Sequence, residues 1–216
     1  MYDKPISYSG RSLYAKCPHK WHDNYILGNR RPSGTAADRG TYLHELLEDY
    51  FKEKAPYPSG NRALAPWQKF METLAAGHPV AEGEVAVTKD WKKCEFDDPA
   101  AYFRGKKDLE IDVSPILHLY DWKSGKEYSN HVVQGKDYAA LTPGYEDYVV
   151  HFVYLDQPHY VKTWDYTAAQ VEAHKQELIT DIETIRNAVE YPATPGDECK
   201  WCHLSWRKGG DCKRAP

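Results

Sequence analysis

Two strand-like segments separated by a very short connection constrain the fold of this chain most strongly. Residues 101–113 and 116–125 are rich in aromatic and aliphatic side chains and are bounded by turn residues, which is typical of β-strands. A connection this short joins only antiparallel neighbours, because a parallel connection needs roughly a dozen residues or more. We therefore expect the two segments to form an antiparallel pair.

The rest of the chain places helices around such a sheet. A final helix is expected from Thr167 to Glu190, because Thr167 and Gln170 form a capping-box pattern and apolar residues follow at helical spacing. The order of segments predicts an α/β (α+β) layered domain, and the length of 216 residues suits a single domain. The other predicted strands are 83–91, 147–156 and 159–166, and the other predicted helices are 10–26, 36–53, 63–76 and 131–141.

Composition narrows the functional classes. The N-terminus has no basic residues followed by an apolar run, and no run of about 18 apolar residues occurs anywhere. We therefore expect no signal peptide and no membrane span, and we expect an intracellular protein. The net charge of −4 argues against a protein that coats nucleic acid by charge alone. Basic residues nevertheless gather in three clusters; one cluster is typical of a solvated face, but three allow a local phosphate-binding surface. The clusters are Lys89, Lys92 and Lys93; Arg104, Lys106 and Lys107; and Lys200, Arg207, Lys208, Lys213 and Arg214.

The segment LYDWKSGK places a carboxylate and a lysine side by side. Asp121 and Lys123 stand at i and i+2 of a predicted strand, so they leave the same face of the sheet. Asp108 lies on the preceding strand and could converge with them. One or two carboxylates with open positions suit Mg²⁺, and a nearby lysine suits phosphodiester hydrolysis. The alternative is an exposed ladder of surface ion pairs.

The five cysteines favour metal ligation over disulfides, because their number is odd and no secretory signal is present. Cys17 stands in the first predicted helix, and Cys199, Cys202 and Cys212 close the chain. Four thiolates suit either zinc or a [4Fe–4S] cluster, and residue chemistry alone leaves both open. Cys94 is interpreted as a structural thiol.

Four motifs in order carry a family resemblance. RGTYLHELLED, RGKKDLEI, YDWKSG and QGKDYAAL resemble the motifs of the RecB-like branch of the PD-(D/E)xK nuclease superfamily. The chain is most similar to the iron–sulfur members: the CRISPR-adaptation exonuclease, the AddB-type helicase-nuclease subunit and small phage exonucleases. The resemblance implies a restriction-endonuclease-like core over about residues 36–190 of a single nuclease domain 1–216.

The resemblance also implies roles for individual residues. The metal, Mg²⁺ or Mn²⁺, would be held by His44, Asp108, Asp121 and the backbone carbonyl of Trp122, and Lys123 would be the catalytic lysine. Gln134 and Tyr138, one helical turn apart, would position the DNA. Glu84 stands where relatives often carry an acidic residue, which is a less specific match. Without the resemblance, His44 would be interpreted as an ordinary helix histidine, and Gln134 and Tyr138 as helix surface and core.

For the cysteines the resemblance favours the iron–sulfur cluster. One cysteine before the first motif and three at the C-terminus would staple the Cys17 region to residues 195–216. Nine residues separate Cys202 from Cys212, which is longer than the usual gap, so His19, His22 or His203 could replace Cys212. Nearby tryptophans, Trp21, Trp201 and Trp206, could stack on bases or shield the cluster.

The predicted function is a metal-dependent DNA exonuclease acting on single strands or DNA ends. Its expected partner is DNA, together with proteins of replication, recombination or CRISPR adaptation. We expect it in the cytoplasm of a bacterial or archaeal host, and a phage could encode it. Three alternatives stay open: a non-catalytic nucleic-acid-binding subunit of a helicase-nuclease complex, a structural module stapled by zinc, and a sequence-specific endonuclease.

Overall fold

The computed structural model describes residues 2–32 and 34–213, and these form two compact units. Among the described residues, the central unit comprises 34–178, and the terminal unit comprises 2–32 together with 179–213. Each unit is described by itself. The predicted extent of a single nuclease domain, 1–216 with a core of about 36–190, stays a prediction.

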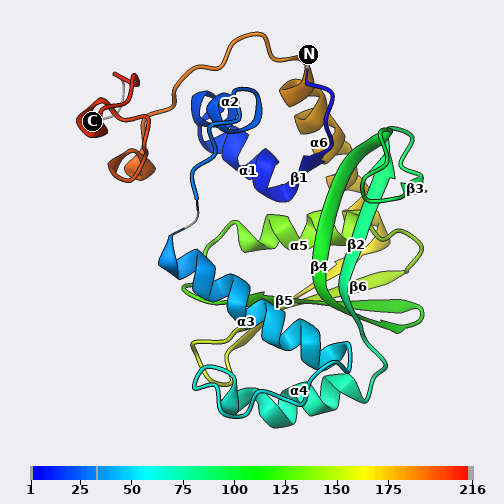
Figure 1. Ribbon diagram of the computed structural model, residues 1–216. Helices are drawn as coiled ribbons and strands as arrows, with labels where there is room; N and C mark the ends of the chain where they lie inside the picture. The colour runs from blue at the N-terminus through cyan, green and yellow to red at the C-terminus, as the bar shows by residue number, and fades with distance from the viewer. Residues whose placement is uncertain (1, 33, 214–216) are drawn as a thin grey trace. The chain divides into compact units, whose positions relative to one another are not determined.

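The central unit is built on a mixed sheet (Figure 1). The predicted hairpin is confirmed, because β4 and β5 pair antiparallel from Val113 opposite Ile116 to Leu109 opposite Tyr120. β5 and β6 run parallel, and α5 (His131–Ala140) forms the crossover between them. The strands, in the spatial order β3-β2-β4-β5-β6-β7, are β2 (Val80–Thr88), β3 (Lys93–Cys94), β4 (Ala101–Val113), β5 (Ile116–Lys123), β6 (Asp147–Tyr154) and β7 (Val161–Thr167).

Helices cover both faces of this sheet (Figure 1). On one face, α3 (Thr35–Phe51), the short helix η1 (Ala65–Trp67) and α4 (Gln68–Ala75) bury an apolar core against the strands. On the other face, α5 packs closely on β6 at Gly135. The predicted mixed sheet flanked by helices is therefore confirmed. The core of the first face includes Leu43, Leu47, Met71, Leu109, Trp122 and Leu155.

The terminal unit has an aromatic core. Trp21 is fully buried and contacts the rings of Tyr2, Tyr14, Tyr25 and Tyr191. The elements of this unit are β1 (Ile6–Ser7), α1 (Tyr8–Lys16), α2 (Pro18–Tyr25), the end of α6 (Ala168–Asn187), η2 (Asp197–Lys200) and η3 (Trp206–Lys208).

The first predicted helix, 10–26, is in fact two helices that meet at Cys17. Cys17 has an extended backbone, with φ −159° and ψ 98°. Pro18 explains the break, because a proline ring disfavours helical geometry in the residue before it. Cys17 thus stands in the junction between α1 and α2 and not inside a helix.

The capping box predicted for the last helix is confirmed. The backbone N–H of Thr167 donates to Oε1 of Gln170 at 2.9 Å, and the N–H of Gln170 donates to Oγ1 of Thr167 at 3.3 Å. No helix among the described residues is both long enough and apolar enough to cross a membrane.

Candidate active site

Asp108 stands where β4 and β5 separate. The β4–β5 ladder ends with Leu109 opposite Tyr120, and Asp108 is the next residue along β4. Its Oδ2 accepts a hydrogen bond from the backbone N–H of Trp122 at 2.6 Å. The carboxylate therefore satisfies a backbone donor of β5 and is fixed beside Asp121.

α3 brings His44 to this point because its neighbours Leu43 and Leu47 are buried in the core. His44 Nε2 lies 2.9 Å from the carbonyl oxygen of Trp122, and Nδ1 lies 3.1 Å from Oδ1 of Asp108. Burial disfavours the imidazolium, but the Asp108 carboxylate outweighs it and the pKa of His44 is raised to about 9. Both ring nitrogens then carry protons that they donate to these two oxygens.

Glu82 completes the cluster. One ligand atom from each of His44, Glu82 and Asp108 lies within 4.8 Å of the others. Burial and then the charge of Asp108 raise the pKa of Glu82 to about 7. Glu82 therefore holds its proton up to near neutral pH, and a bound cation would stabilise its charged form.

Glu82 is absent from the site residues predicted from sequence, which include Glu84 instead. The β2–β4 register pairs Glu84 with Lys106, and Nζ of Lys106 lies 2.5 Å from Oε1 of Glu84. Glu82 falls between Ala81 and Gly83, which pair with Leu109 and Lys107, and so lies opposite Asp108. An alternating strand pattern marks both glutamates, and only the register separates them.

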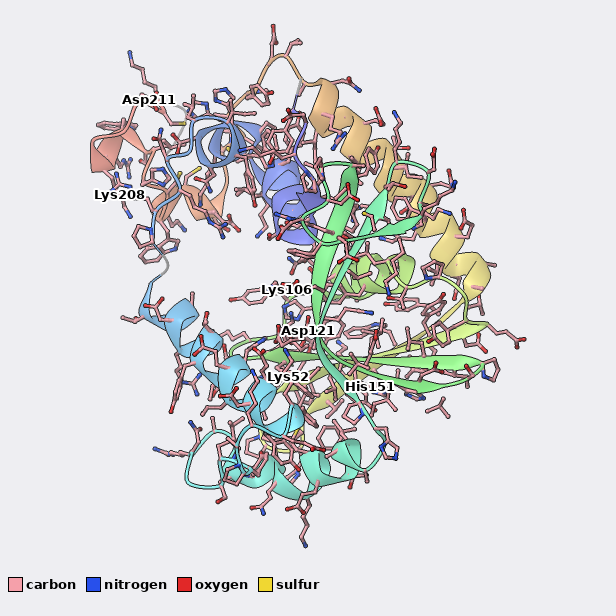
Figure 2. The ribbon with its side chains drawn as sticks, turned by 45° about the vertical axis from the view of Figure 1, so that its right-hand side comes forward. Lys52, Lys106, Asp121, His151, Lys208 and Asp211 are labelled. Atoms are coloured by element: carbon pink, nitrogen blue, oxygen red, sulfur yellow. The ribbon has the colours of Figure 1, made fainter. Side chains whose placement is uncertain are left out.

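A second group of side chains continues from Asp121, which is 3% exposed and lies among the strands of the central unit (Figure 2). Lys123 Nζ lies 2.5 Å from Oδ1 of Asp121 and donates to Oε1 of Gln134 at 2.7 Å. Gln134 Nε2 donates to the hydroxyl of Tyr138 at 2.8 Å. The prediction that Asp121 and Lys123 share one face, and that the Gln134 helix faces them, agrees with this geometry.

Burial sets the protonation of this second group. It raises the pKa of Asp121 to about 6, although the Lys123 ammonium acts in the opposite direction and Asp108 adds to the increase. Burial, with the charges of Asp121 and Asp108, also raises the pKa of Tyr138 well above its ordinary value. Tyr138 therefore keeps a neutral hydroxyl group at the end of the Asp121–Lys123–Gln134–Tyr138 series of contacts. A nearby cation would stabilise the charged form of Asp121.

The residue types fit a hard divalent cation. Two carboxylates and an imidazole supply the ligand atoms at His44, Glu82 and Asp108, and the carbonyl of Trp122 lies against His44. Asp121 and Lys123 stand next to this set without belonging to the three-residue cluster. The arrangement can hold an ion on one side and an ammonium group on the other.

The four predicted cysteine ligands lie in the terminal unit and line one cavity: Cys17, Cys199, Cys202 and Cys212. All four are free thiols. The histidine that could replace Cys212 from the same segment, His203, has its Nε2 on Oδ2 of Asp23 at 2.9 Å instead. The donor set facing the cavity is therefore the four thiols, joined by His19 on its wall.

The three tryptophans considered for base stacking have different environments. Trp21 is fully buried in the aromatic core, so the suggestion that it stacks on bases is wrong. Trp201 and Trp206 are 81% and 54% exposed in the C-terminal segment, where Lys208 and Asp211 also lie (Figure 2). Lys208 Nζ is 5.7 Å from the ring centre of Trp201.

Comparisons with known proteins place the chain in a family. The sequence model of the PD-(D/E)XK nuclease superfamily matches residues 5–207. A protein from Eubacterium rectale, provisionally named an exonuclease, has a similar structure, with 12% sequence identity and a TM-score of 0.60 over 95% of this chain and 88% of that one. The crystal structure of SSO0001 covers 100% of this chain and 89% of its own at 13% identity and a TM-score of 0.46. No curated protein matches the chain in sequence.

Proposed function

Because this chain belongs to the PD-(D/E)XK nuclease superfamily, we propose that it is a metal-dependent deoxyribonuclease that degrades DNA from its ends. The observation that carries the proposal is the convergence of His44, Glu82 and Asp108 within 4.8 Å beside the Asp121–Lys123 pair. The name of the Eubacterium rectale neighbour supports the exonuclease assignment.

Mg²⁺ or Mn²⁺ would be held by Glu82, Asp108 and the adjoining Asp121, with the Trp122 carbonyl and a deprotonated His44 as further ligands. When bound, the ion polarises a phosphoryl oxygen and makes bound water more acidic. The raised pKa values of Glu82 and Asp121 support this assignment, because added positive charge would stabilise the charged form of both carboxyl groups.

Lys123 is proposed to hold the attacking water and to offset the negative charge that develops on the phosphate. Its ammonium is fixed from two sides, by Oδ1 of Asp121 at 2.5 Å and by Oε1 of Gln134 at 2.7 Å. Tyr138 in turn fixes the amide of Gln134. The side chains of α5 therefore keep the ammonium in place before substrate arrives, which lowers the reorganisation needed during reaction.

A [4Fe–4S] cluster is proposed at Cys17, Cys199, Cys202 and Cys212. A single tetrahedral zinc, with Zn–S bonds of about 2.3 Å, would hold its sulfur atoms about 3.8 Å apart. Among the described residues, no three cysteine sulfur atoms lie within 4.8 Å of one another. Four thiols lining one cavity suit either ligand, and the resemblance of the cysteine pattern to that of the iron–sulfur nucleases favours the cluster.

The proposed substrate is a single strand or an exposed DNA end. Trp201 and Trp206 offer exposed rings beside Lys208 and Arg207, a combination that suits stacking on bases and contact with phosphates. Such contacts carry no sequence code, so we expect little sequence preference. Replication, recombination and CRISPR adaptation are the proposed settings.

The test uses end-labelled single-stranded and duplex DNA, with a circular single strand as a comparison. We expect hydrolysis of the linear substrates with Mg²⁺ or Mn²⁺, loss with chelator, and a drop of about a thousandfold or more in Asp121→Asn. Asp90→Asn, in an exposed turn, is the matched control and should keep full activity. Activity that survives both chelator and Asp121→Asn overturns the proposal, and equal cutting of the circle overturns the exonuclease assignment.

A further inference from the structure

α3 borders a second hollow on the flank that faces away from the active site. Tyr42 and His44 are two residues apart on α3, and at about 100° per residue they point to opposite sides of the helix. The hollow beside Tyr42 has a volume of about 730 Å³. Its other walls are the segment 61–63 and the turn 155–158, and this volume is within the range of about 300–1,000 Å³ typical of ligand sites.

The floor of the hollow is apolar and one wall is aromatic. Leu43 and Leu155 line it and are buried, whereas Tyr42 is 53% exposed. An exposed tyrosine ring next to an apolar floor suits a flat heterocycle, because bases stack on aromatic side chains with about 1–3 kcal/mol per base.

The rim of the hollow has one cation that is free to bind a ligand. Arg39 makes two hydrogen bonds to the carboxylate of Asp156, at 2.9 and 2.5 Å, so these two charges cancel. Arg62 is exposed and makes no hydrogen bond or ion pair within the part of the chain that the structure describes. The net charge of the hollow is therefore positive, from Arg62, which suits a phosphate group.

We propose that this hollow binds one nucleotide of a single DNA strand, with its base on Tyr42 and its phosphate at Arg62. The inference rests on the proposed nuclease function and names a binding site for the same substrate away from the bond that is cut.

The backbone connects this hollow to the active site. The N–H of Leu155, in the floor, donates to the carbonyl oxygen of Lys123 at 2.9 Å. Between the two flanks lies the start of α3, where Gly34 caps the helix without a side-chain hydrogen bond. The N–H groups of Ala37 and Asp38 donate to the carbonyl oxygen of Gly34, at 2.8 and 3.1 Å, which leaves those of Thr35 and Ala36 in this first turn for a phosphate. A strand passing around the start of α3 would contact both flanks.

The test measures binding of a fluorescent 16-nucleotide oligothymidylate in chelator, so that no strand is cut. We expect Tyr42→Ala to raise the Kd by about 5- to 100-fold and Tyr42→Phe to leave it within about twofold, because phenylalanine keeps the stacking face. Arg62→Gln should reduce the slope of log Kd against log salt by about 0.7, the value for one phosphate contact on a single strand. Lys69→Gln, an exposed cation on α4, is the matched control and should bind as wild type.

A second readout locates the contact. An oligonucleotide with 5-iodouracil at each position in turn should cross-link to Tyr42 after irradiation, as read by peptide mass spectrometry. Binding by Tyr42→Ala equal to wild type, or cross-links that never include Tyr42, overturns the inference. If wild type hydrolyses DNA while the Tyr42 and Arg62 variants bind normally, the inference fails and the nuclease function stands. If binding depends on Tyr42 but the wild-type protein hydrolyses no DNA, the binding site stands and the nuclease function fails.

Discussion

At the scale of single residues, the register of β2 decides which acidic group belongs to the candidate metal site. Glu82 lies opposite Asp108, whereas Glu84 is paired with Lys106 on the exposed part of the same face. Glu82 also has a positive φ of 51°, which is uncommon for a non-glycine residue and is found more often at functional sites. The two glutamates are therefore chemically alike and differ only in position.

This difference predicts opposite outcomes for two matched variants. Glu82→Gln should weaken Mn²⁺ binding by about tenfold or more and reduce hydrolysis in parallel, because a ligand and its charge are lost. Glu84→Gln should bind Mn²⁺ within about twofold of wild type. Titration calorimetry with the metal alone measures both. Equal weakening in the two variants would show that general negative charge, and not the position of Glu82, attracts the ion.

The residues of the site were predictable to different degrees for physical reasons. Asp121 and Lys123 could be placed together because neighbours at i and i+2 of a strand share a face. Gln134 and Tyr138 could be placed together because residues one turn apart share a face of a helix. Glu82 could not be separated from Glu84, because that choice depends on the pairing of β2 with a strand about 25 residues away.

At the scale of elements, the position of α5 depends on a glycine. A Cβ atom at Gly135 would lie 2.9 Å from Cγ1 of Val150 and 3.3 Å from Cζ of Phe152. The absence of a side chain therefore allows α5 to approach β6, and this approach brings Gln134 within 2.7 Å of the Lys123 ammonium.

Gly135→Ala should consequently impair both stability and activity. Alanine favours the helix by about 1 kcal/mol, but overpacking against Val150 costs about 1–3 kcal/mol, so we expect a net destabilisation of about 1 kcal/mol. The shift of α5 should also lower kcat by loosening the Gln134–Lys123 contact. Gly60→Ala, which meets no atom within 4 Å, is the control. Urea denaturation and single-turnover hydrolysis check both effects, and an unchanged kcat would show that the Lys123 contact tolerates the shift.

The strands β5 to β7 predict a dependence of stability on pH. Nε2 of His151 lies 3.1 Å from Nδ1 of His118, and Nδ1 of His151 lies 3.0 Å from the Thr163 hydroxyl (Figure 2 labels His151). The Tyr120 ring stacks on the imidazole of His151, with ring centroids 4.4 Å apart. Burial, and secondarily the charge of His118, lowers the pKa of His151 to about 4. Asp165 acts on His118 in the opposite direction, but burial still lowers the pKa of His118.

A histidine with a lowered pKa in the folded state binds a proton more readily when the chain is unfolded. Stability is therefore full above the unfolded pKa of about 6.5 and falls as the pH decreases toward 4. In His151→Gln, the decrease in the free energy of unfolding at low pH should be smaller by on the order of 1–2 kcal/mol, after allowance for the partial exposure of the ring. The measurement is the free energy of unfolding at pH 7 and pH 4.5 for both proteins. Identical pH profiles would contradict the assignment to His151.

Most elements were predictable from sequence because their signals are local. The capping box at Thr167 sets the start of α6, and the short connection 113–116 sets the ends of β4 and β5. In both cases the residues that set the boundary are close together in the sequence. The first helix was predicted as continuous because its apolar spacing continues past Cys17, yet Pro18 breaks it there. That break leaves Cys17 at the junction of α1 and α2, on the wall of the thiol cavity.

At the scale of the whole molecule, the two compact units are stabilised by different means. The central unit buries an apolar core between its sheet and α3 and α4. The C-terminal part of the terminal unit has almost none, because Ser205 alone is buried among residues 191–213. A segment of this composition gains too little from apolar burial to offset its conformational entropy, so another interaction must order it.

With the proposed cluster bound, ligation of the four thiols would supply that interaction, and order in the C-terminal segment would depend on the cluster. Cys202→Ser, prepared without oxygen, should lose most of the roughly four iron and four sulfide ions of a [4Fe–4S] cluster. Residues 191–213 should then become sensitive to trypsin while the central unit stays resistant. Cys94→Ser, in β3 of the central unit, is the matched control and should keep both the metal and the resistance. Zinc in place of iron would reassign the ligand, and a protease-resistant, metal-free Cys202→Ser protein would show that the segment is ordered without any ligand.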